Sequence, residues 1–357
     1  MINWNIRLTD NILLFSIIVL SSFGLILLYS ATNQDLDIVY RQGARLIFCF
    51  CLMLLIGFTD INKVKSISPY IYIICITLLI ITLFWGHDSK GAKRWIVLFG
   101  FSFQVSEVLK IIIPMCLAWF LSFSEDKDMD LKKLVICFLI ILLPIFFVIK
   151  QPDLGTSLII FLCGFISIFL GGIRKKHIFY LLGIFLTMIP LMWKFILLPY
   201  QKQRILTMID PSADPLGSGY HIIQSKIAVG SGGFFGKGFL NGTQSQLEFL
   251  PERGTDFIFA VFAEEFGFFG VLILFLFYSL ILARCIHITN KSKTYYSKIL
   301  SGSITCIFLL LILTNISMAV GLLPVVGVTL PLVSLGGSSL LSIFIAFGIM
   351  FSINRRN

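Results

Sequence analysis

Three acidic residues lie where a long polar stretch of the chain meets an apolar run. The segment 252–256 reads Glu-Arg-Gly-Thr-Asp, and Glu264 and Glu265 follow one or two helical turns into the apolar run. Asp256 could cap a helix that begins there, yet three acids exceed what capping requires. A carboxylate in a membrane-embedded cleft is desolvated, which favours its protonated form and suits a general base near neutral pH. We therefore expect Asp256 to be a functional acid.

Charged residues also stand at the start of another apolar run. Glu107 and Lys110 are three positions apart, so on a helix they share one face and can form an ion pair. They lie about one turn inside the run, deeper than a side chain easily reaches back to water, which favours a functional role. Arg94 and Trp95 precede the run, and an interfacial aromatic anchor would explain Trp95 equally well.

Two further segments place polar groups at the ends of apolar runs. Asp153 precedes a run and is equally suited to cap its N-terminus or to act in a site. Residues 321–339 are rich in glycine, proline and small hydroxyl residues, among them Ser334. Irregular backbone at membrane depth is tolerated only where it lines a cavity or packs in protein, so we expect this segment to border a site.

Membrane-spanning helices must position these residues. The 357 residues are 57% hydrophobic and 13% charged, with a mean hydropathy of +0.96, and apolar runs of about 20 residues recur from end to end. We expect an all-α integral membrane protein in which residues 1–357 form a single domain. About ten spans are predicted, near 12–31, 43–59, 68–86, 105–123, 133–149, 155–171, 177–199, 257–284, 299–323 and 335–353.

Basic residues set the expected orientation. Lysines and arginines cluster in alternate connections, at 63–65, 127–133, 174–176, 284–298 and 355–356. Because positive charge resists translocation, these connections and both termini should be cytoplasmic. The long segment 200–255, between the seventh and eighth spans, should then be an extracytoplasmic loop. The same rule explains the net charge of +10 without a nucleic-acid partner.

The long segment 200–255 is expected to be ordered. A loop of this length is normally either functional or disordered, and its composition favours order. Tyr220, Ile223 and Ile227 predict a short apolar helical face, and GSGGFFGKG at 230–238 predicts a glycine-rich turn. We expect the segment to lie on the membrane surface or to fold back into it.

These groups, in this order along a ten-span chain, resemble the SEDS family of peptidoglycan glycosyltransferases, the shape, elongation, division and sporulation proteins. The resemblance covers the whole chain. The stretch from Asp214 to Glu265, with LPERGTDF near its end, resembles the rod-shape (RodA-type) branch more than the division (FtsW-type) branch. It implies that a sugar hydroxyl of one lipid II displaces undecaprenyl pyrophosphate from the reducing end of the glycan chain. A β-1,4 glycan strand then grows during cell elongation and maintains rod shape.

The resemblance also assigns roles. It implies that Asp256 is the base that takes the proton of the acceptor hydroxyl, and that Trp95 is a second activity-sensitive position. We expect Glu264 to support Asp256 and Lys110 to face it. Gly254 stands where the family usually has histidine, and glycine can neither tune a neighbouring acid nor hold substrate.

Positive charge or a metal ion must stabilise the leaving pyrophosphate. We expect Lys110, Arg94 and Arg204 to supply this charge from the outer side, with a divalent cation, Mg²⁺ or Mn²⁺, as the other source. The residues expected to bind substrate or support activity are Trp95, Arg94, Glu107, Lys110, Asp153, Arg204, Glu264 and Ser334.

The resemblance implies partners and a location. The partners are lipid II, a single-span class B penicillin-binding transpeptidase and other elongation-complex membrane proteins, in the cytoplasmic (inner) membrane of a bacterium. Two other functions would explain the same charges. One is a lipid II flippase or transporter, and the other is a non-catalytic scaffold for a wall synthase. Glycan strands made from lipid II would separate the enzyme from both.

Overall fold

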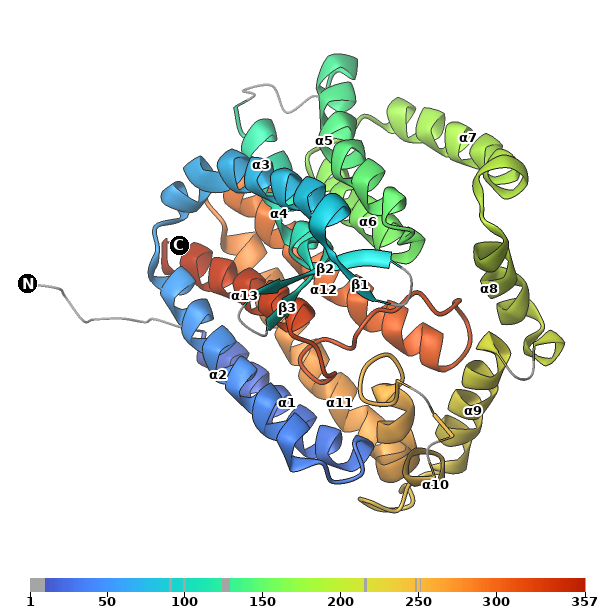
Figure 1. The fold of residues 1–357 in the computed structure, drawn as a ribbon. Coiled ribbons are helices and arrows are strands. Elements are labelled where there is room, and N and C mark those ends of the chain that lie inside the picture. Colours follow the sequence, from blue (N-terminus) through green and yellow to red (C-terminus); the bar gives the residue numbers. More distant parts are fainter. Residues whose placement is uncertain are drawn as a thin grey trace, which may run out of the picture.

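A bundle of apolar helices forms the body of the protein (Figure 1). The computed structural model describes residues 10–89, 92–98, 101–123, 129–214, 217–247, 249–250 and 252–356. The apolar helices are α1 (Asn11–Ala31), α2 (Leu36–Phe58), α3 (Ile61–Trp85), α4 (Val105–Leu121), α5 (Leu131–Lys150), α6 (Leu154–Leu170), α7 (Lys175–Leu191), α11 (Ile258–Lys291), α12 (Tyr295–Ala319) and α13 (Ser338–Arg356). Each corresponds to one expected span. Among the described residues, 8 helices are long and apolar enough to cross a membrane, and α6 is a shorter apolar helix.

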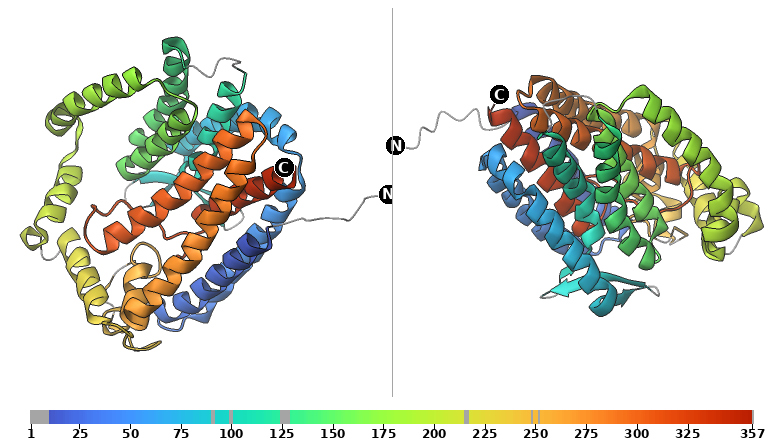
Figure 2. Two further views of the ribbon diagram at one scale, coloured as in Figure 1. Left: turned by 180° about the vertical axis from the view of Figure 1, so that it is seen from behind. Right: turned by 90° about the horizontal axis from the view of Figure 1, so that it is seen from above.

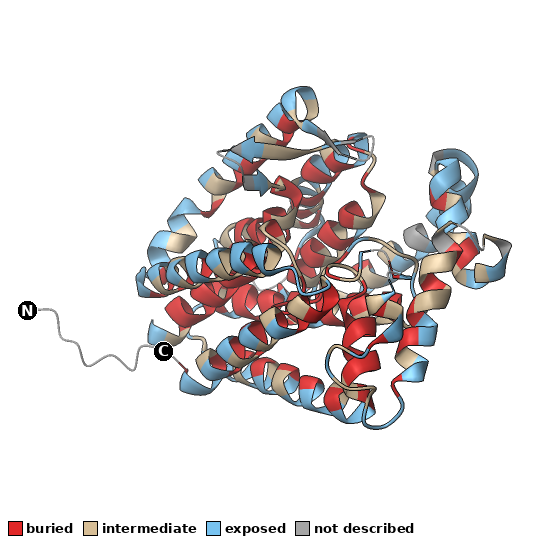
Figure 3. Cartoon of the chain, turned by 60° about the horizontal axis from the view of Figure 1, so that its bottom comes forward, coloured by how far each residue is buried: buried red, intermediate tan, exposed pale blue. Residues whose placement is uncertain are grey.

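Helix α4 lies at the centre of the bundle. It contacts α3, α5, α6, α12 and α13, and most of its residues are buried. Around it, α1 packs on α11 and α2 packs on α13. Buried residues gather where the helices meet, whereas many large apolar side chains are exposed on the outside (Figure 3). Apolar surface of this extent is expected of helices that face lipid.

The first and last described residues, Asp10 and Arg356, lie at the same end of the bundle. Arg284 of α11 donates from Nε to Asp10, just before α1 (2.6 Å), and Arg355 of α13 donates to the carbonyl of Phe58 at the end of α2 (2.8 Å). At the opposite end of α1, Thr32 lies beside Gly254. The end of the long segment 200–255 is therefore at the far side of the bundle from Asp10 and Arg356, as the basic residues predicted.

A small antiparallel sheet joins α3 to α4, where the sequence predicted only a connection. Its strands, in the order β1-β2-β3, are β1 (His87–Ser89), β2 (Ala92–Leu98) and β3 (Phe101–Phe103). The sheet projects from one end of the bundle (Figure 2, right). A search for apolar runs long enough to span a membrane does not detect strands this short.

The long segment 200–255 is folded, as its composition predicted. It contains α8 (Pro199–Ile209), the 3₁₀ turn η2 (Pro211–Ala213), α9 (Ser218–Ser231) and α10 (Thr243–Gln246). Before it, α7 continues into the π-helical turn η1 (Met192–Ile196). In Figures 1 and 2, α7 and α8 form an arm beside the bundle, and α9 and α10 lie against the start of α11.

The face of α9 that packs inward differs from the predicted one. The predicted face ends at Ile227, whose side chain is 45% exposed. Ile222, Ser225 and Ala228 are buried instead. The Ser225 hydroxyl donates to the carbonyl of Ala319 at the end of α12 (2.6 Å). Small side chains allow this close approach of α9 and α12. A pattern of large apolar residues does not predict such a contact.

Helix α11 is kinked at Gly267, where the backbone leaves the helical region (φ 63°, ψ −165°). In an unbroken helix the amides of residues 268 and 269 would bond the carbonyls of residues 264 and 265. Here these amides and carbonyls of α11 form hydrogen bonds with the glycine-rich turn instead. Its amides at 237 and 238 donate to the carbonyls of 264 and 265 (3.0 and 2.9 Å), and its carbonyls at 233 and 234 accept from 268 and 269 (3.0 Å each).

Candidate active site

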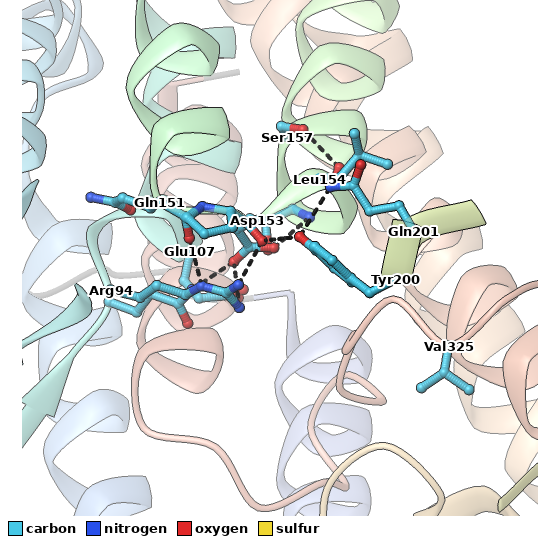
Figure 4. Close-up of polar contacts among 12 residues, drawn as sticks. Arg94, Glu107, Gln151, Asp153, Leu154, Ser157, Tyr200, Gln201 and Val325 are labelled. Carbon is cyan, nitrogen blue, oxygen red and sulfur yellow. Dashed lines mark hydrogen bonds and ion pairs between the residues drawn. The ribbon is translucent and has the colours of Figure 1, made fainter. Parts of the chain in front are cut away.

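Asp153 and Arg94 form an ion pair at the start of α6 (Figure 4). Arg94 Nη1 lies 3.5 Å from Asp153 Oδ2, and the Asp153 side chain is only 10% exposed. The other oxygen, Oδ1, accepts from the amide of Thr156 (3.2 Å) and so caps the helix. The two interpretations of Asp153 are thus compatible, because each oxygen has its own partner.

Arg94 also holds the turn that precedes α6. Its Nε donates to the carbonyl of Gln151 (2.9 Å) and its Nη2 to the carbonyl of Pro152 (2.7 Å). Tyr200 of α8 donates its hydroxyl to the same Pro152 carbonyl (3.0 Å). Figure 4 shows Arg94 and Tyr200 converging on this turn. One turn therefore joins the sheet, the bundle and the external segment.

Trp95 lies on the other face of the sheet. It follows Arg94 directly on β2 and lies opposite His87 of β1. Since successive side chains of a strand point to opposite faces, Trp95 points away from the side on which Arg94 meets Asp153. Its side chain is half-buried.

Glu107 and Lys110 form the ion pair that their spacing predicted. Lys110 Nζ lies 2.7 Å from Glu107 Oε1, and the two side chains are 4% and 13% exposed respectively. Lys110 is therefore a buried cation, and not one that is open to the outer side as expected. Its ion-pair partner among the described residues is Glu107, as the spacing predicted, and no described contact joins it to Asp256, which it was expected to face. A buried pair of this kind needs both partners, because either charge alone would be poorly compensated.

Asp256 lies in the turn directly before α11 and is partly exposed. Its backbone carbonyl accepts from Asn315 Nδ2 (2.9 Å). Its Oδ2 is 3.8 Å from the position that a Cβ of residue 327 would occupy. That residue is Gly327, with φ +75°, a conformation that other residues adopt only with strain. The absence of a side chain at 327 leaves room beside the carboxylate.

Ser334 holds the backbone of the same turn. Its hydroxyl donates to the carbonyl of Thr255 (2.7 Å) and accepts from the amide of Leu330 (2.8 Å). The amide of Leu335 donates to the carbonyl of Gly254 (2.8 Å). Ser334 is 5% exposed, so it contributes to the site through the backbone that precedes Asp256 and not by reaching a substrate.

Gly254 packs closely against the end of α1. A Cβ at this position would lie 3.3 Å from Leu28 Cδ1 and 3.9 Å from Thr32 Cγ2. Leu28 would have to shift slightly to admit any side chain here. Helix α1 therefore packs closely against the position at which the family usually has histidine.

Glu264 anchors the external segment to α11. Its side chain is fully buried, and its carboxylate accepts from Lys237 Nζ (2.7 Å), Thr243 Oγ1 (3.0 Å) and the amide of Gln244 (3.1 Å). At a rise of about 1.5 Å per residue, it lies roughly 12 Å along the chain axis from Asp256. Glu264 supports the fold of the external segment and is not positioned next to Asp256.

The segment 324–335 connects the remaining candidates. Arg204 of α8 is exposed and donates to the carbonyl of Val325 (3.1 Å). Gly155 of α6 packs on Val326, whose carbonyl is 2.7 Å from where a Cβ at 155 would lie. Residues 327 and 328 then reach the turn of Asp256. The candidates gathered around this segment are Arg94, Asp153, Arg204, Asp256 and Ser334.

Sequence reasoning missed Asn315. This residue lies near the C-terminal end of the apolar helix α12, is 0% exposed, and donates to backbone carbonyls on both sides of the site. A lone amide within a predicted span is costly and usually marks a functional or paired position. Asn315 lies within the predicted span 299–323, but a single amide side chain does not by itself indicate a type of reaction.

The described residues do not form a cage for a metal ion. No group of three or more His, Cys, Asp or Glu among them could hold one. The carboxylates of Asp153, Glu107 and Glu264 are already paired with cations of the chain. The expected divalent cation stays a prediction.

The chain is similar to known proteins over nearly its whole length. Residues 3–357 match the family model described as cell cycle protein, which covers FtsW, RodA and SpoVE. Over 351 residues the chain is 41% identical to the peptidoglycan glycosyltransferase MrdB of Escherichia coli (strain K12), covering 98% of this chain and 95% of that protein.

Two solved structures share the fold. One is a chain of a peptidoglycan synthase complex that coordinates polymerization and crosslinking. It has a TM-score of 0.83 and 29% identity, covering 96% of this chain and 97% of that chain. The other is the rod shape determining protein RodA of Thermus thermophilus, with a TM-score of 0.74 and 26% identity, covering 99% and 98%.

Proposed function

This chain belongs to the cell cycle protein family of FtsW, RodA and SpoVE, and we propose that it polymerises lipid II into β-1,4 glycan strands during cell elongation. It is a multi-pass membrane glycosyltransferase of peptidoglycan synthesis. The observation that carries the proposed chemistry is the placement of Asp256. Its carboxylate lies where the external segment enters the bundle, on a turn whose backbone is fixed by Asn315, Ser334 and Leu335.

A partly exposed carboxylate on a turn whose backbone is held in place suits a general base. In the proposed step, the acceptor hydroxyl oxygen forms a bond to the anomeric carbon of the donor sugar. The bond from that carbon to the pyrophosphate oxygen breaks, and undecaprenyl pyrophosphate leaves with the bonding electron pair. Asp256 takes the proton of the hydroxyl as the new bond forms. Room beside its carboxylate at Gly327 is what an incoming hydroxyl requires.

Two arginines are the best-placed cations for the leaving pyrophosphate. Arg204 is exposed next to the segment 324–328, and the Arg94 side chain is 31% exposed beside Asp153. Guanidinium groups match the geometry of phosphate oxygens. Lys110 contributes less directly, because Glu107 neutralises it in the interior of the bundle.

The proposed partner is a class B penicillin-binding transpeptidase. The support is the shared fold with a chain of a complex that couples polymerization to crosslinking. Other elongation-complex membrane proteins and a cytoplasmic (inner) membrane location belong to the same proposal. The start of α1 and the end of α13 lie at one end of the bundle, opposite the end of the external segment, which fits this orientation.

The test is polymerisation by the purified protein with its partner transpeptidase and lipid II. Glycan strands are resolved by gel electrophoresis for the wild type, Asp256→Ala and Asp210→Asn. Asp210 is a matched control, since it is an acid of the external segment that caps η2. We expect strands from the wild type and the control, and none from Asp256→Ala. Equal polymer from all three would refute the assignment of the base, and no polymer from the wild type would refute the function.

A further inference from the structure

The side chain of Asn315, near the C-terminal end of α12, makes two hydrogen bonds to other segments of the chain. Its Nδ2 donates to the carbonyl of Asp256 (2.9 Å) and to the carbonyl of Val328 (2.7 Å). Both acceptors are carbonyl oxygens, so the atom that faces them must be the nitrogen and not the oxygen of the amide. The two protons of one planar group therefore bind two separate segments of backbone.

The two segments are the two sides of the candidate site. Asp256 belongs to the turn before α11, and Val328 belongs to the segment 324–335. The same segment receives Arg204 at its Val325 carbonyl and places Gly327 beside the Asp256 carboxylate. Because an amide nitrogen holds its two protons at a fixed angle, Asn315 sets how far apart these two backbones lie.

We propose that Asn315 is a positioning residue that holds the Asp256 carboxylate in register with the segment 324–328. This inference rests on the proposed function, in which Asp256 is the base. Asn315 is fully buried and does not reach a substrate, so its effect passes through the backbone of its two partners.

The unpaired atom of the amide strengthens the argument. Asn315 Oδ1 is buried and has no hydrogen-bond partner within the described part of the chain. A buried polar group without a partner is unfavourable, and an apolar residue of similar size would avoid it. Only the two donor bonds made by Nδ2 compensate for this arrangement. The two N–H donors of Asn315 are thus the feature of this side chain on which the site depends.

The experiment compares Asn315→Leu, Asn315→Asp and Asn315→Gln with Thr314→Val in the complex with the partner. Thr314 is a matched control, because it neighbours Asn315 on α12 and its hydroxyl donates within the helix to the carbonyl of Leu310 (2.7 Å). The measurements are kcat and KM for lipid II, the melting temperature in detergent, and amide hydrogen exchange in peptides covering 252–258 and 325–330.

We expect Asn315→Leu and Asn315→Asp to lower kcat about tenfold or more, since a misplaced reacting group commonly loses this much. KM should stay near that of Thr314→Val, whereas the melting temperature should fall, because the carbonyls of Asp256 and Val328 lose their donor. Exchange should accelerate in both peptides. Asn315→Gln keeps an amide donor and should recover part of the kcat that Asn315→Leu loses. Asn315→Ser, which needs less space, replaces any variant that does not fold.

Hydrogen exchange separates this inference from the proposed function. Unchanged exchange in both peptides would overturn the positioning role of Asn315, whatever the activity. Faster exchange with wild-type kcat would overturn the link to catalysis. Failure of the proposed function is seen independently, as the absence of polymer from the wild type in the same assay, and failure of the base assignment is seen as wild-type polymer from Asp256→Ala.

Discussion

Lys237 and Glu264 form an ion pair of 2.7 Å that joins the external segment to the interior of α11. The two partners are unequally placed, since the Glu264 side chain is fully buried and the Lys237 side chain is 27% exposed. Removal of the lysine leaves a buried carboxylate without its cation. Removal of the carboxylate charge leaves an ammonium group that can turn towards water. The two substitutions should therefore differ in their effects.

We expect Lys237→Met to lower the free energy of unfolding by about 3 kcal/mol, and Glu264→Gln by about 1 kcal/mol. Unfolding of the purified protein in detergent measures both. Lys202→Met, which changes another lysine of the external segment, is the control and should have little effect. Equal losses from the two substitutions would contradict the asymmetry that the burial predicts.

The buried pair of Glu107 and Lys110 should behave as a unit. Glu107→Leu or Lys110→Met alone leaves one charge in the interior of the bundle, and each should cost about 3–5 kcal/mol of unfolding free energy. The double substitution removes both charges and should recover much of this loss. A double-mutant cycle from unfolding in detergent gives the coupling between them. Additive losses would show that the two charges do not depend on each other.

Asp153 allows its two roles to be separated. Asp153→Asn keeps an oxygen for the amide of Thr156 but loses the charge that faces Arg94, whereas Asp153→Ala loses both. We expect Asp153→Ala to destabilise the protein by about 1 kcal/mol more than Asp153→Asn, the usual effect of a lost helix cap.

Polymerisation rates then report the role of the charge at Asp153. If the pair with Arg94 orients the guanidinium for pyrophosphate, both variants should be slower than the wild type by a similar factor. A wild-type rate for Asp153→Asn would mean that Asp153 acts only as a cap.

Gly267 should not tolerate a side chain. A Cβ at this position would lie 2.2 Å from the amide nitrogen of Gly236, and its φ of +63° is strained for other residues. Gly267→Ala should therefore detach the glycine-rich turn from α11, destabilise the protein by about 1–3 kcal/mol and accelerate proteolysis within 230–247. In Gly183→Ala, the matched control on α7, a Cβ meets nothing within 4 Å. Identical proteolysis of the two variants would argue against the docked turn.

The apolar helices of this protein could be predicted from the sequence because each is specified locally. A run of apolar residues long enough to span a membrane must form a helix there, since its backbone groups have no other partners. Helical spacing also predicted the ion pair of Glu107 and Lys110, which the structure contains. The choice of Asp256, at the start of a span, as the functional acid stays a prediction. The orientation followed from the clusters of basic residues.

Contacts between distant segments could not be predicted in this way. Glu264 is paired with Lys237, 27 residues away, and Asn315 binds Asp256, 59 residues away. Neither periodicity nor composition predicts such pairings. The sequence therefore placed Glu264 beside Asp256, and Asn315 was overlooked. The sheet that carries Arg94 and Trp95 was missed for a related reason. Its strands of 3, 7 and 3 residues depend on one another more than on their own sequence.

The hydrogen bonds between the glycine-rich turn and the kink of α11 also limit which substitutions can accumulate in this sequence during evolution. Gly236 and Gly267 share a space that a single methyl group on either would fill. A change at one cannot be offset by a smaller residue at the other, because none exists. In relatives that keep the kink, both positions should therefore be invariant and should show no covariation. The segments around 236 and 267 would be inherited together, and a chimera that exchanged only one of them between relatives should fold only where both parents carry the two glycines.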